Sequence, residues 1–259
     1  MASDINVASV DADRFDRQKR IAQWDQEKIK KQNVLVIGAG ALGNETVKLL
    51  LQLGVGKITL VDFDTVVPAN LNRCVFFSQE DADQHRFKAE VIAEKAAKTF
   101  PDTAVTADHR AVEKLPETVF QTHDAVFGCL DNLGARLHAN AQTYHYAPFF
   151  DGGTNGFFGK LQVVSKPSSC LECGMNNRDY KLLWKKYSCV GETLDYLDPK
   201  TPAIPTTTSV VAAMQINAWL ANLFEQNQSA GKYVHYNGLT QQTQTFDVPK
   251  RKTCPVHPG

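Results

Sequence analysis

A glycine-rich turn between an apolar strand and a helix is the feature of this sequence that most constrains its fold. Residues 33–37 (NVLVI) form a short, nearly continuous apolar run, as expected of a parallel strand buried on both faces. Gly38, Gly40 and Gly43 follow with the spacing G-x-G-x-x-G, and residues 44–53 have helical composition. A Cβ in such a turn would keep a phosphate away from the N–H groups at the helix N-terminus. The pattern therefore predicts a Rossmann-type nucleotide site.

Strands and helices alternate through the first half of the chain. The predicted strands are at 57–62, 103–107 and 124–130, and the predicted helices are at 88–100 and 134–146. This alternation indicates an α/β fold with a Rossmann-like, mostly parallel sheet and helices on both faces. We expect the second half to extend the sheet with mixed or antiparallel strands around one long helix. These strands are at 160–164, 233–236 and 243–248, and the helix is at 206–226.

Three segments of the second half carry local signals of their own. Asp151-Gly-Gly-Thr154 follows a strand and is expected to form a turn where glycine lets a substrate approach closely. Pro205 is expected to stop any preceding structure, and one of the threonines at 206–208 to cap the long helix. Residues 181–204 have no clear periodicity, which is common in functional loops.

Length, charge and hydropathy bound the class of protein. With 259 residues, 43% hydrophobic and 22% charged, the chain is long enough for one large α/β domain, preceded by a polar arm at 1–31. Lys plus Arg equals Asp plus Glu at 28 each, so no net field attracts nucleic acid or an anionic membrane. No apolar run approaches the roughly 20 residues of a membrane span, and the start lacks a secretory signal. We expect a cytoplasmic protein that binds neither nucleic acid nor membranes.

An acid, an amide and two cations follow the glycine turn. Asp62 ends the second predicted strand, where a carboxylate can accept hydrogen bonds from ribose hydroxyls. That arrangement suits NAD as well as ATP. Positive side chains at Arg73 and Lys88, close to Asp64 and Asn70 in the sequence, suit a triphosphate, whose charge must be neutralised more than that of a dinucleotide. The sequence favours ATP, and an NAD-linked oxidoreductase is the alternative.

Two pairs of metal-ligating residues share the C-x-x-C type of spacing. Cys170 and Cys173 form one pair, and Cys254 and His257 form the other. Four protein ligands would close a tetrahedral Zn²⁺ site and leave no open position, so the role would be structural. Plain reduced cysteines are the alternative. The remaining thiols of Cys74 and Cys129 are interpreted as packing residues.

Longer motifs occur in a characteristic order. They are R-F-D-R-Q at 14–18, G-A-G-A-L-G-N-E at 38–45, D-F-D-T-V-x-x-x-N-L-N-R at 62–73, C-L-D-N-x-x-A-R at 129–136 and D-G-G-T-x-G-x-x-G at 151–159. Together with Lys88 and the two metal-ligand pairs, this series resembles the ubiquitin-activating enzymes and their prokaryotic relatives. Those relatives are the ThiF/MoeB-like and HesA sulfur-carrier adenylyltransferases. The resemblance extends from about residue 14 to residue 257, nearly the whole chain.

The resemblance implies ATP- and Mg²⁺-dependent adenylation of the C-terminal glycine carboxylate of a ubiquitin-like or sulfur-carrier protein. Residues 32–259 would form a single adenylation domain, with a crossover loop at about 181–204 and a zinc-tethered C-terminus. Asp131 would hold Mg²⁺, a cation that prefers carboxylate and phosphate oxygens. The implied nucleotide-binding residues are Gly38, Gly40, Gly43, Asp62, Asp64, Asn70, Arg73, Lys88, Asp131 and Asn132.

Further implied roles belong to Arg17 and to the zinc ligands. Arg17 would be an arginine finger that reaches ATP bound by the neighbouring subunit, which requires a homodimer. The alternatives are that Arg17 is a surface helix residue and that Asp131 is a helix N-cap. Relatives with this zinc site usually have four cysteines, and His257 departs from that pattern. Arg136 and Asn140 could face the nucleotide or brace their helix against the sheet.

The role of Cys189, in the expected crossover loop, has two alternatives. A thiol at Cys189 could attack the acyl-adenylate and keep the carboxyl group as a thioester, or it could be an incidental thiol. A thioester would make a conjugating enzyme a further partner, beside the carrier protein with its Gly-Gly-type C-terminus. The chain could also be a non-catalytic subunit of a heterodimeric activating enzyme. The intact set of Arg73, Lys88 and Asp131 argues against that alternative.

Overall fold

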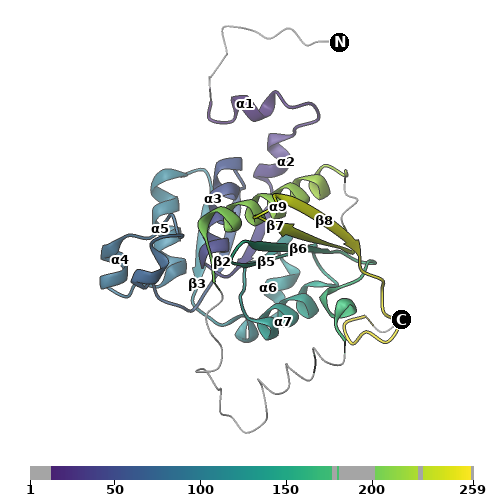
Figure 1. Ribbon diagram of the computed structural model, residues 1–259. Coiled ribbons are helices and arrows are strands. Elements are labelled where there is room, and N and C mark those ends of the chain that lie inside the picture. The colour runs from purple at the N-terminus through teal and green to yellow at the C-terminus, as the bar shows by residue number, and fades with distance from the viewer. Residues whose placement is uncertain (1–12, 177–179, 181–201, 227–229, 258–259) are drawn as a thin grey trace.

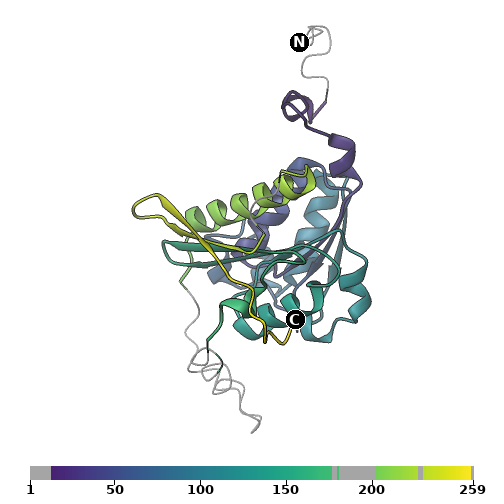
Figure 2. The ribbon, with the colours of Figure 1, turned by 90° about the vertical axis from the view of Figure 1, so that its right-hand side faces the viewer.

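The computed structural model describes residues 13–176, 180, 202–226 and 230–257 (Figure 1). Two short helices, α1 (Asp16–Lys19) and α2 (Gln26–Lys30), form the described part of the N-terminal arm. Both views place α1 at one end of the molecule, beyond the sheet (Figures 1 and 2). The arm is helical where it is described, and its division from a single domain stays a prediction.

One eight-stranded sheet runs through the molecule in the order β3-β2-β1-β4-β5-β6-β7-β8. Strands β1 to β5 are parallel, and β6 to β8 continue the sheet antiparallel. The predicted fold class, a mostly parallel Rossmann-like sheet with an antiparallel C-terminal extension, is confirmed. The strands are β1 Asn33–Ile37, β2 Lys57–Val61, β3 Ala104–Asp108, β4 Ala125–Gly128, β5 Phe149–Asn155, β6 Phe158–Val164, β7 Lys232–Asn237 and β8 Gln242–Asp247.

Helices cover both faces of the sheet, as predicted (Figure 2). Successive strand residues point to opposite faces, so Val36 of β1 belongs to one core and Leu35 to the other. The Val36 face carries α3, α5 and α9, and the Leu35 face carries α6 and α7. The bounds are α3 Ala41–Leu53, α4 Gln79–Asp83, α5 Lys88–Thr99, α6 Glu117–Gln121, α7 Leu133–Thr143 and α9 Pro205–Leu223, with short 3-10 helices η2 Pro68–Asn70, η3 Val112–Lys114 and η4 Leu171–Gly174.

The strand order contains a topological switch point between β1 and β4. Sheets of this type bind ligands at the carboxyl ends of the strands, in the crevice at such a switch point. Gly38 follows β1 there, and Cys129 to Asp131 follow β4. The N–H of Cys129 donates to the carbonyl of Ile37 at 2.8 Å, which joins the two strand ends. The topology therefore brings the glycine turn and Asp131 to the same edge of the sheet.

The turn predicted at residues 151–154 is wrong, because these residues lie inside β5. The chain instead turns at Gly156, which has φ +55°. Two adjacent glycines are tolerated in the strand because neighbouring side chains fill the space above them. A Cβ on Gly152 would lie 2.8 Å from Leu42 and from Gln215, so β5 passes close beneath α3 and α9.

The predicted threonine cap of the long helix is also wrong. Helix α9 begins at Pro205, with Ile204 as its N-cap residue and no side-chain cap. Proline suits the first helical position because its φ is preset and its missing N–H would have had no partner. Thr208 donates its hydroxyl to the carbonyl of Pro205 at 2.8 Å, so it binds the helix backbone from inside the first turn. None of the helices that the structure describes has the length and apolar character to cross a bilayer.

Candidate active site and metal centre

The glycine turn has two tightly packed positions and one open position. Gly38 has φ +101°, and a Cβ there would lie 2.5 Å from the carbonyl oxygen of Cys129. A Cβ on Gly43 would lie 1.9 Å from the oxygen of Gly38, so both sites require glycine for packing. Gly40, the N-cap of α3, is different, because a Cβ there would meet no atom within 4 Å. The packing of the chain does not explain glycine at position 40, and a ligand against the helix N-terminus would.

Asp62 lies at the carboxyl end of β2 and touches the glycine turn. Its carboxylate accepts hydrogen bonds from the N–H of Ala39 at 2.6 Å and from the N–H of Asp64 at 2.8 Å. Burial raises the pKa of Asp62, and the nearby Lys88 and the two N–H groups offset only part of that effect. A carboxylate has about four lone-pair positions, so Asp62 keeps acceptor capacity for hydroxyl groups.

Lys88 is a buried cation at the start of α5. Its side chain contacts Asp64, with 2.6 Å between Nζ and a carboxylate oxygen, and Lys88 is 8% exposed. The N–H of Lys88 also donates to the carbonyl of Asp64 at 3.0 Å, which fixes the start of the helix. An ammonium group has three donors, so the contact with Asp64 leaves others for a phosphate.

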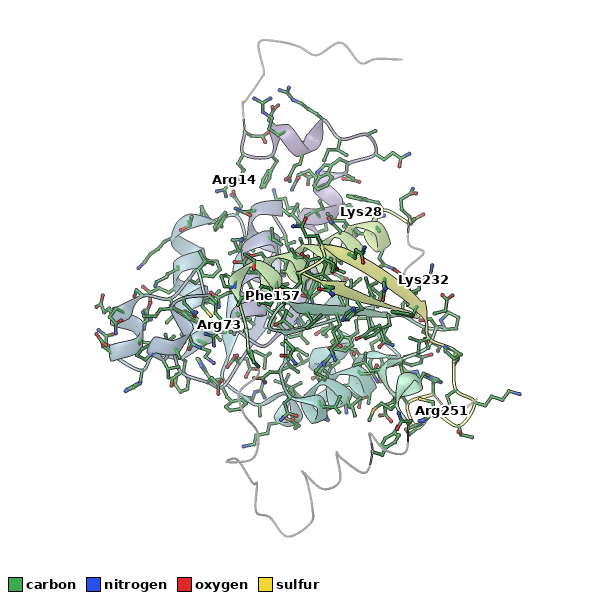
Figure 3. All side chains as sticks on the ribbon, in the orientation of Figure 1. Arg14, Lys28, Arg73, Phe157, Lys232 and Arg251 are labelled. Carbon is green, nitrogen blue, oxygen red and sulfur yellow. The ribbon has the colours of Figure 1, made fainter. Side chains whose placement is uncertain are left out.

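Arg73 lies in the segment that follows η2, and Figure 3 shows it on the side of the molecule that carries α4 and α5. Its guanidinium donates to the carbonyl of Ala69 and to the side chain of Asn72. Burial raises the pKa of the neighbouring Cys74 to about 11. The positive charges of Arg73 and Lys88 oppose this rise in pKa, so both cations lie near the Cys74 thiol. Arg73 and Lys88 therefore share one region with Asp62.

Asn70 and Asn44 hold this region together. The side-chain oxygen of Asn70 accepts from the N–H of Val67 at 3.0 Å, so Asn70 braces the turn before Arg73. Asn44 is fully buried in α3, where its amide donates to the carbonyls of Ala39 and Gly40 and its oxygen accepts from the N–H of Phe76. Asn44 was not singled out from the sequence, although a polar residue in the apolar first turn of a helix is a usable signal.

Asp131 and Asn132 divide two roles at the start of α7. Asn132 is the N-cap residue, and its side-chain oxygen accepts from the N–H groups of Gly134 at 2.8 Å and Ala135 at 3.3 Å. Asp131 is exposed, and it has no hydrogen bond or ion pair with any residue that the structure describes. The N-cap alternative for Asp131 is therefore excluded. An exposed carboxylate at the switch point is a suitable ligand for Mg²⁺.

Arg17 lies far from the glycine turn of its own chain. It belongs to α1, whose neighbour Gln18 donates to the carbonyl of Leu53 at 3.2 Å, at the C-terminal end of α3. Helix α3 has 13 residues, which corresponds to a length of about 20 Å. The glycine turn is at the other end of α3, so Arg17 lies outside the nucleotide crevice of its own chain.

Cys170, Cys173, Cys254 and His257 come together as predicted, with their ligand atoms within 4.8 Å of one another. The sulfurs of Cys170 and Cys254 are 3.5 Å apart, and Cys173 is 3.1 Å from Nε2 of His257. Zn–S bonds of about 2.3 Å in a tetrahedron require spacings close to these. Burial lowers the pKa of His257, which favours the neutral imidazole that binds metals. The four residues fit a structural Zn²⁺.

Of the two residues that could face the nucleotide or brace α7 against the sheet, Arg136 braces the helix, whereas Asn140 contacts η4. Arg136 pairs with Asp151 of β5, with 2.9 Å between Nε and a carboxylate oxygen, and both residues are buried. The side-chain oxygen of Asn140 accepts from the N–H of Leu171 at 3.1 Å, which joins α7 to the start of η4.

The structure describes two of the three thiols outside the metal-ligand cluster, those of Cys74 and Cys129. Burial raises the pKa of Cys129 to about 12, so Cys129 and the similarly buried Cys74 are protonated, as expected of packing residues. The candidate nucleophile Cys189, like most of the predicted crossover loop, lies outside the described residues. Its assignment stays a prediction.

Comparisons with known proteins identify the family. The ThiF family model matches residues 14–256. The sulfur carrier protein ThiS adenylyltransferase of Escherichia coli is 33% identical over 245 residues, which covers 92% of this chain and 91% of that protein. The SUMO-activating enzyme subunit uba-2 of Caenorhabditis elegans is 35% identical over 152 residues, 57% of this chain and 26% of that protein.

The fold has solved counterparts as well. The crystal structure of Escherichia coli MccB with ATP has a TM-score of 0.77 and 20% identity, and the match covers 97% of this chain and 75% of that one. This likeness concerns the fold alone. The chain spans about a quarter of the length of the eukaryotic activating-enzyme relatives that it matches. Together, the family model and the full-length similarity to the ThiS adenylyltransferase show that this chain belongs to the ThiF family.

Proposed function

We propose that this protein binds ATP at the glycine turn and adenylates the C-terminal glycine carboxylate of a ubiquitin-like or sulfur-carrier protein. The single observation that carries the proposal is the open position at Gly40, in a turn whose Ala39 N–H binds Asp62, the carboxylate on which the charge of the buried Lys88 acts. A helix N-terminus without a covering side chain, beside a cation with unused donors, suits the phosphates of a nucleotide. Membership of the ThiF family supports this chemistry over an NAD-linked oxidoreductase.

The proposed reaction is an in-line displacement at the α-phosphorus of ATP. A carboxylate oxygen of the carrier forms the new O–P bond, the bond to the bridging oxygen of the β-phosphate breaks, and pyrophosphate leaves. Negative charge grows on the phosphate oxygens during this step. Fixed cations such as Lys88 and Arg73 stabilise that charge more than they stabilise the ground state, so they accelerate the step. Asp62 would orient the nucleotide through its ribose.

Asp131 is the proposed ligand of Mg²⁺, because its carboxylate is exposed at the switch point and unused in the described part of the chain. A magnesium ion bound there would neutralise charge on the phosphate oxygens. Asn132, which caps α7, holds the backbone that presents Asp131. The carboxylate oxygens of Asp131 are thus suitable ligands for Mg²⁺.

A homodimer would complete the site. Arg17 lies at the far end of α3 from its own glycine turn, which supports a role at the site of a second subunit. Helix α9 offers a surface for association, because its 19 residues (PTTTSVVAAMQINAWLANL) include no charged side chain. Val210, Ala213 and Met214 are only half-buried there. Half-buried apolar side chains on a helix without charges are a suitable surface for a second subunit.

Two finer proposals concern later steps and location. Thiolate attack by Cys189 on the acyl carbonyl would release AMP and leave a thioester, which a conjugating enzyme could accept. If the enzyme stops at the adenylate, the acyl group would pass to a sulfur donor instead. The reduced cysteines that the zinc site needs are consistent with a cytoplasmic location.

The test is exchange of labelled pyrophosphate into ATP. We would measure it with a ThiS-type sulfur carrier and with a ubiquitin-like modifier, each with and without its final glycine. Exchange that requires an intact Gly-Gly terminus is the expected result. Failure of every carrier to support exchange, with ATP bound normally, would favour a non-catalytic subunit. NAD bound in the crevice with ATP excluded would overturn the nucleotide assignment.

A further inference from the structure

A pocket of about 310 Å³ lies beside the proposed active site, on the sheet face opposite α9. Its wall on the sheet side includes Asp151 of β5, Lys160 of β6 and Tyr233 of β7, and its other wall includes Arg136 of α7. Leu171 and Phe246 add apolar surface. The pocket therefore combines an apolar lining with three charged side chains.

The charges in the pocket do not balance. Both carboxylate oxygens of Asp151 are hydrogen-bonded to Arg136, through Nε and through Nη2. The side chain of Lys160 forms no ion pair or hydrogen bond with any residue in the described ranges, so its ammonium has no counter-ion of its own there. Burial lowers the pKa of Lys160 to about 8, and the charge of Arg136 adds to that effect while Asp151 opposes it. Among the described residues that line the pocket, two cations and one carboxylate leave one excess positive charge.

The side chain of Lys160 is directed toward Arg136, although both are cations. A Cβ on Gly153, the residue paired with Lys160 in the sheet, would lie 2.8 Å from Cε of Lys160 and 3.6 Å from Nη1 of Arg136. Glycine at this position leaves room for the lysine stem to cross β5. Two cations that converge on a pocket with one carboxylate, already held at both oxygens by Arg136, leave an excess positive charge that suits a second carboxylate.

The sheet register places the pocket relative to the glycine turn. Asp151 is level with Gly128 of β4, and Gly128 is level with Ile37, the residue before Gly38. From β1 to β6 there are three strand spacings, or about 14 Å at about 4.8 Å each. An extended peptide covers that distance with about four residues. A chain end at the glycine turn can thus place an earlier side chain in the pocket.

From this geometry we propose that Lys160 selects an acidic side chain about four residues before the reacting carboxylate of the protein tail. The proposal rests on the adenylation function proposed above and deepens it by naming a specificity determinant. Arg136 positions Asp151 and shares the acidic side chain with Lys160. The apolar wall, including Leu171 and Phe246, contacts the rest of the tail.

The test uses synthetic peptides labelled with fluorescein at the N-terminus and ending in Gly-Gly. The members of the set differ only in having Glu, Gln or Lys at the third, fourth or fifth residue before the terminal carboxylate. Binding is measured by fluorescence anisotropy with a non-hydrolysable ATP analogue present. We expect the wild-type protein to bind the best Glu peptide about tenfold more tightly than its Lys counterpart. Lys160→Glu should reverse this order, and Lys160→Gln should remove it.

Lys166→Glu is the matched control, because Lys166 is exposed just beyond β6 and makes the same charge change outside the pocket. It should keep the wild-type order. Thermal unfolding of each variant would show that the fold is intact. Equal binding of Glu and Lys peptides by the wild-type protein, no measurable binding of any peptide, or an unchanged order in Lys160→Glu would each overturn the assignment of Lys160.

Pyrophosphate exchange with the same peptides separates the two proposals. Exchange without any charge preference would overturn the role of Lys160 and leave the adenylation function standing. A charge preference in binding that follows Lys160, with no exchange for any peptide or carrier, would overturn adenylation and leave the pocket as an acidic-tail site.

Discussion

Phe15 packs so closely on Gly54 that a Cβ on this glycine would lie 2.5 Å from Cζ of the phenylalanine ring. Gly54 ends α3 with φ +80°, a conformation that favours glycine. Gln18 and Gln26 both donate to the carbonyl of Leu53 in the same turn. The arm is therefore attached to the end of α3 by one ring and two amides, and Arg17 has a defined position.

If Arg17 acts on the neighbouring subunit, two inactive variants should restore each other. Arg17→Ala and Asp131→Ala damage different subunits of one composite site. Mixing them in equal amounts should recover about a quarter of wild-type exchange, because about half of the dimers are mixed and one site in each is complete. Each variant alone is the control. Mixtures that stay as inactive as the separate variants would show that Arg17 has no role across a dimer.

Asp131→Ala should reduce pyrophosphate exchange at least ~100-fold, since it removes the proposed magnesium ligand at the charged phosphates. The unfolding temperature should stay at the wild-type value, because the Asp131 side chain is exposed and bonds to nothing in the described part of the chain. Asn132→Ala is the comparison: loss of this N-cap should lower the free energy of unfolding by about 1 kcal/mol. Full exchange activity in Asp131→Ala would remove the magnesium assignment.

Gly40→Ala and Gly38→Ala should separate ligand binding from stability. A methyl group at Gly40 meets no protein atom, so the free energy of unfolding from urea denaturation should fall only by the N-cap preference for glycine over alanine, less than about 1 kcal/mol. ATP affinity, measured by calorimetry, should fall about tenfold because the methyl group occupies the phosphate position. Gly38→Ala should cost about 1–3 kcal/mol in unfolding free energy, owing to the positive φ and the contact with Cys129. Unchanged ATP affinity in Gly40→Ala would show that the open position is not the phosphate site.

The purified protein should contain one zinc per chain by elemental mass spectrometry. Removal of the metal with a chelator should lower the melting temperature, since the site joins η4 to the C-terminal segment through Cys170 and Cys254. His257→Cys should retain zinc, and His257→Ala should lose it. A metal-free protein with the same melting temperature as the native sample would mean that the cluster is only a set of reduced thiols and an imidazole.

Acid stability should depend on Asp81. Burial alone would raise the pKa of this carboxyl group, but hydrogen bonds from Lys95 and Ser78 lower it to about 2. Its folded pKa is below the usual value, so its stabilising contribution is present above about pH 4 and is lost as the pH falls toward 2. A shift of this size corresponds to about 2 kcal/mol. Urea denaturation of Asp81→Asn should lack this pH dependence, and the exposed Asp83→Asn should retain it.

Much of the parallel half could be predicted from the sequence, because buried strands leave continuous apolar runs. The run at 33–37 coincides with β1 (Asn33–Ile37), and the glycine spacing located the switch point. The short helices α4 (Gln79–Asp83) and α6 (Glu117–Gln121) were missed, since one turn of helix has too few residues to show a period. Strand β5 was partly mistaken for a turn because Gly152 and Gly153 are usually turn signals, and here they make room for side chains above the sheet.

The site was predictable where a motif fixes the backbone and not where contacts come from distant segments. The cluster of three cysteines and His257, and the position of Asp62 beside the glycine turn, could be predicted because their spacing in the sequence is informative. Gln215 was missed, although it is the fully buried amide that donates to the carbonyls of Gly128 and Phe150 and so ties α9 to the switch-point strands. Lys160 has an ordinary sequence context, and only the structure shows that Arg136 binds both carboxylate oxygens of Asp151.

The cysteine cluster also bears on how the length of this chain can vary. Cys170 and Cys254 fix two points that are far apart in sequence, and α9 is held independently by its packing on α3. The entropy of closing a loop rises by only about 0.6 kcal/mol for each doubling of its length. Insertions or deletions between η4 and α9 should therefore change the free energy of unfolding only slightly. The length of the chain between these two elements can vary while the sheet stays the same.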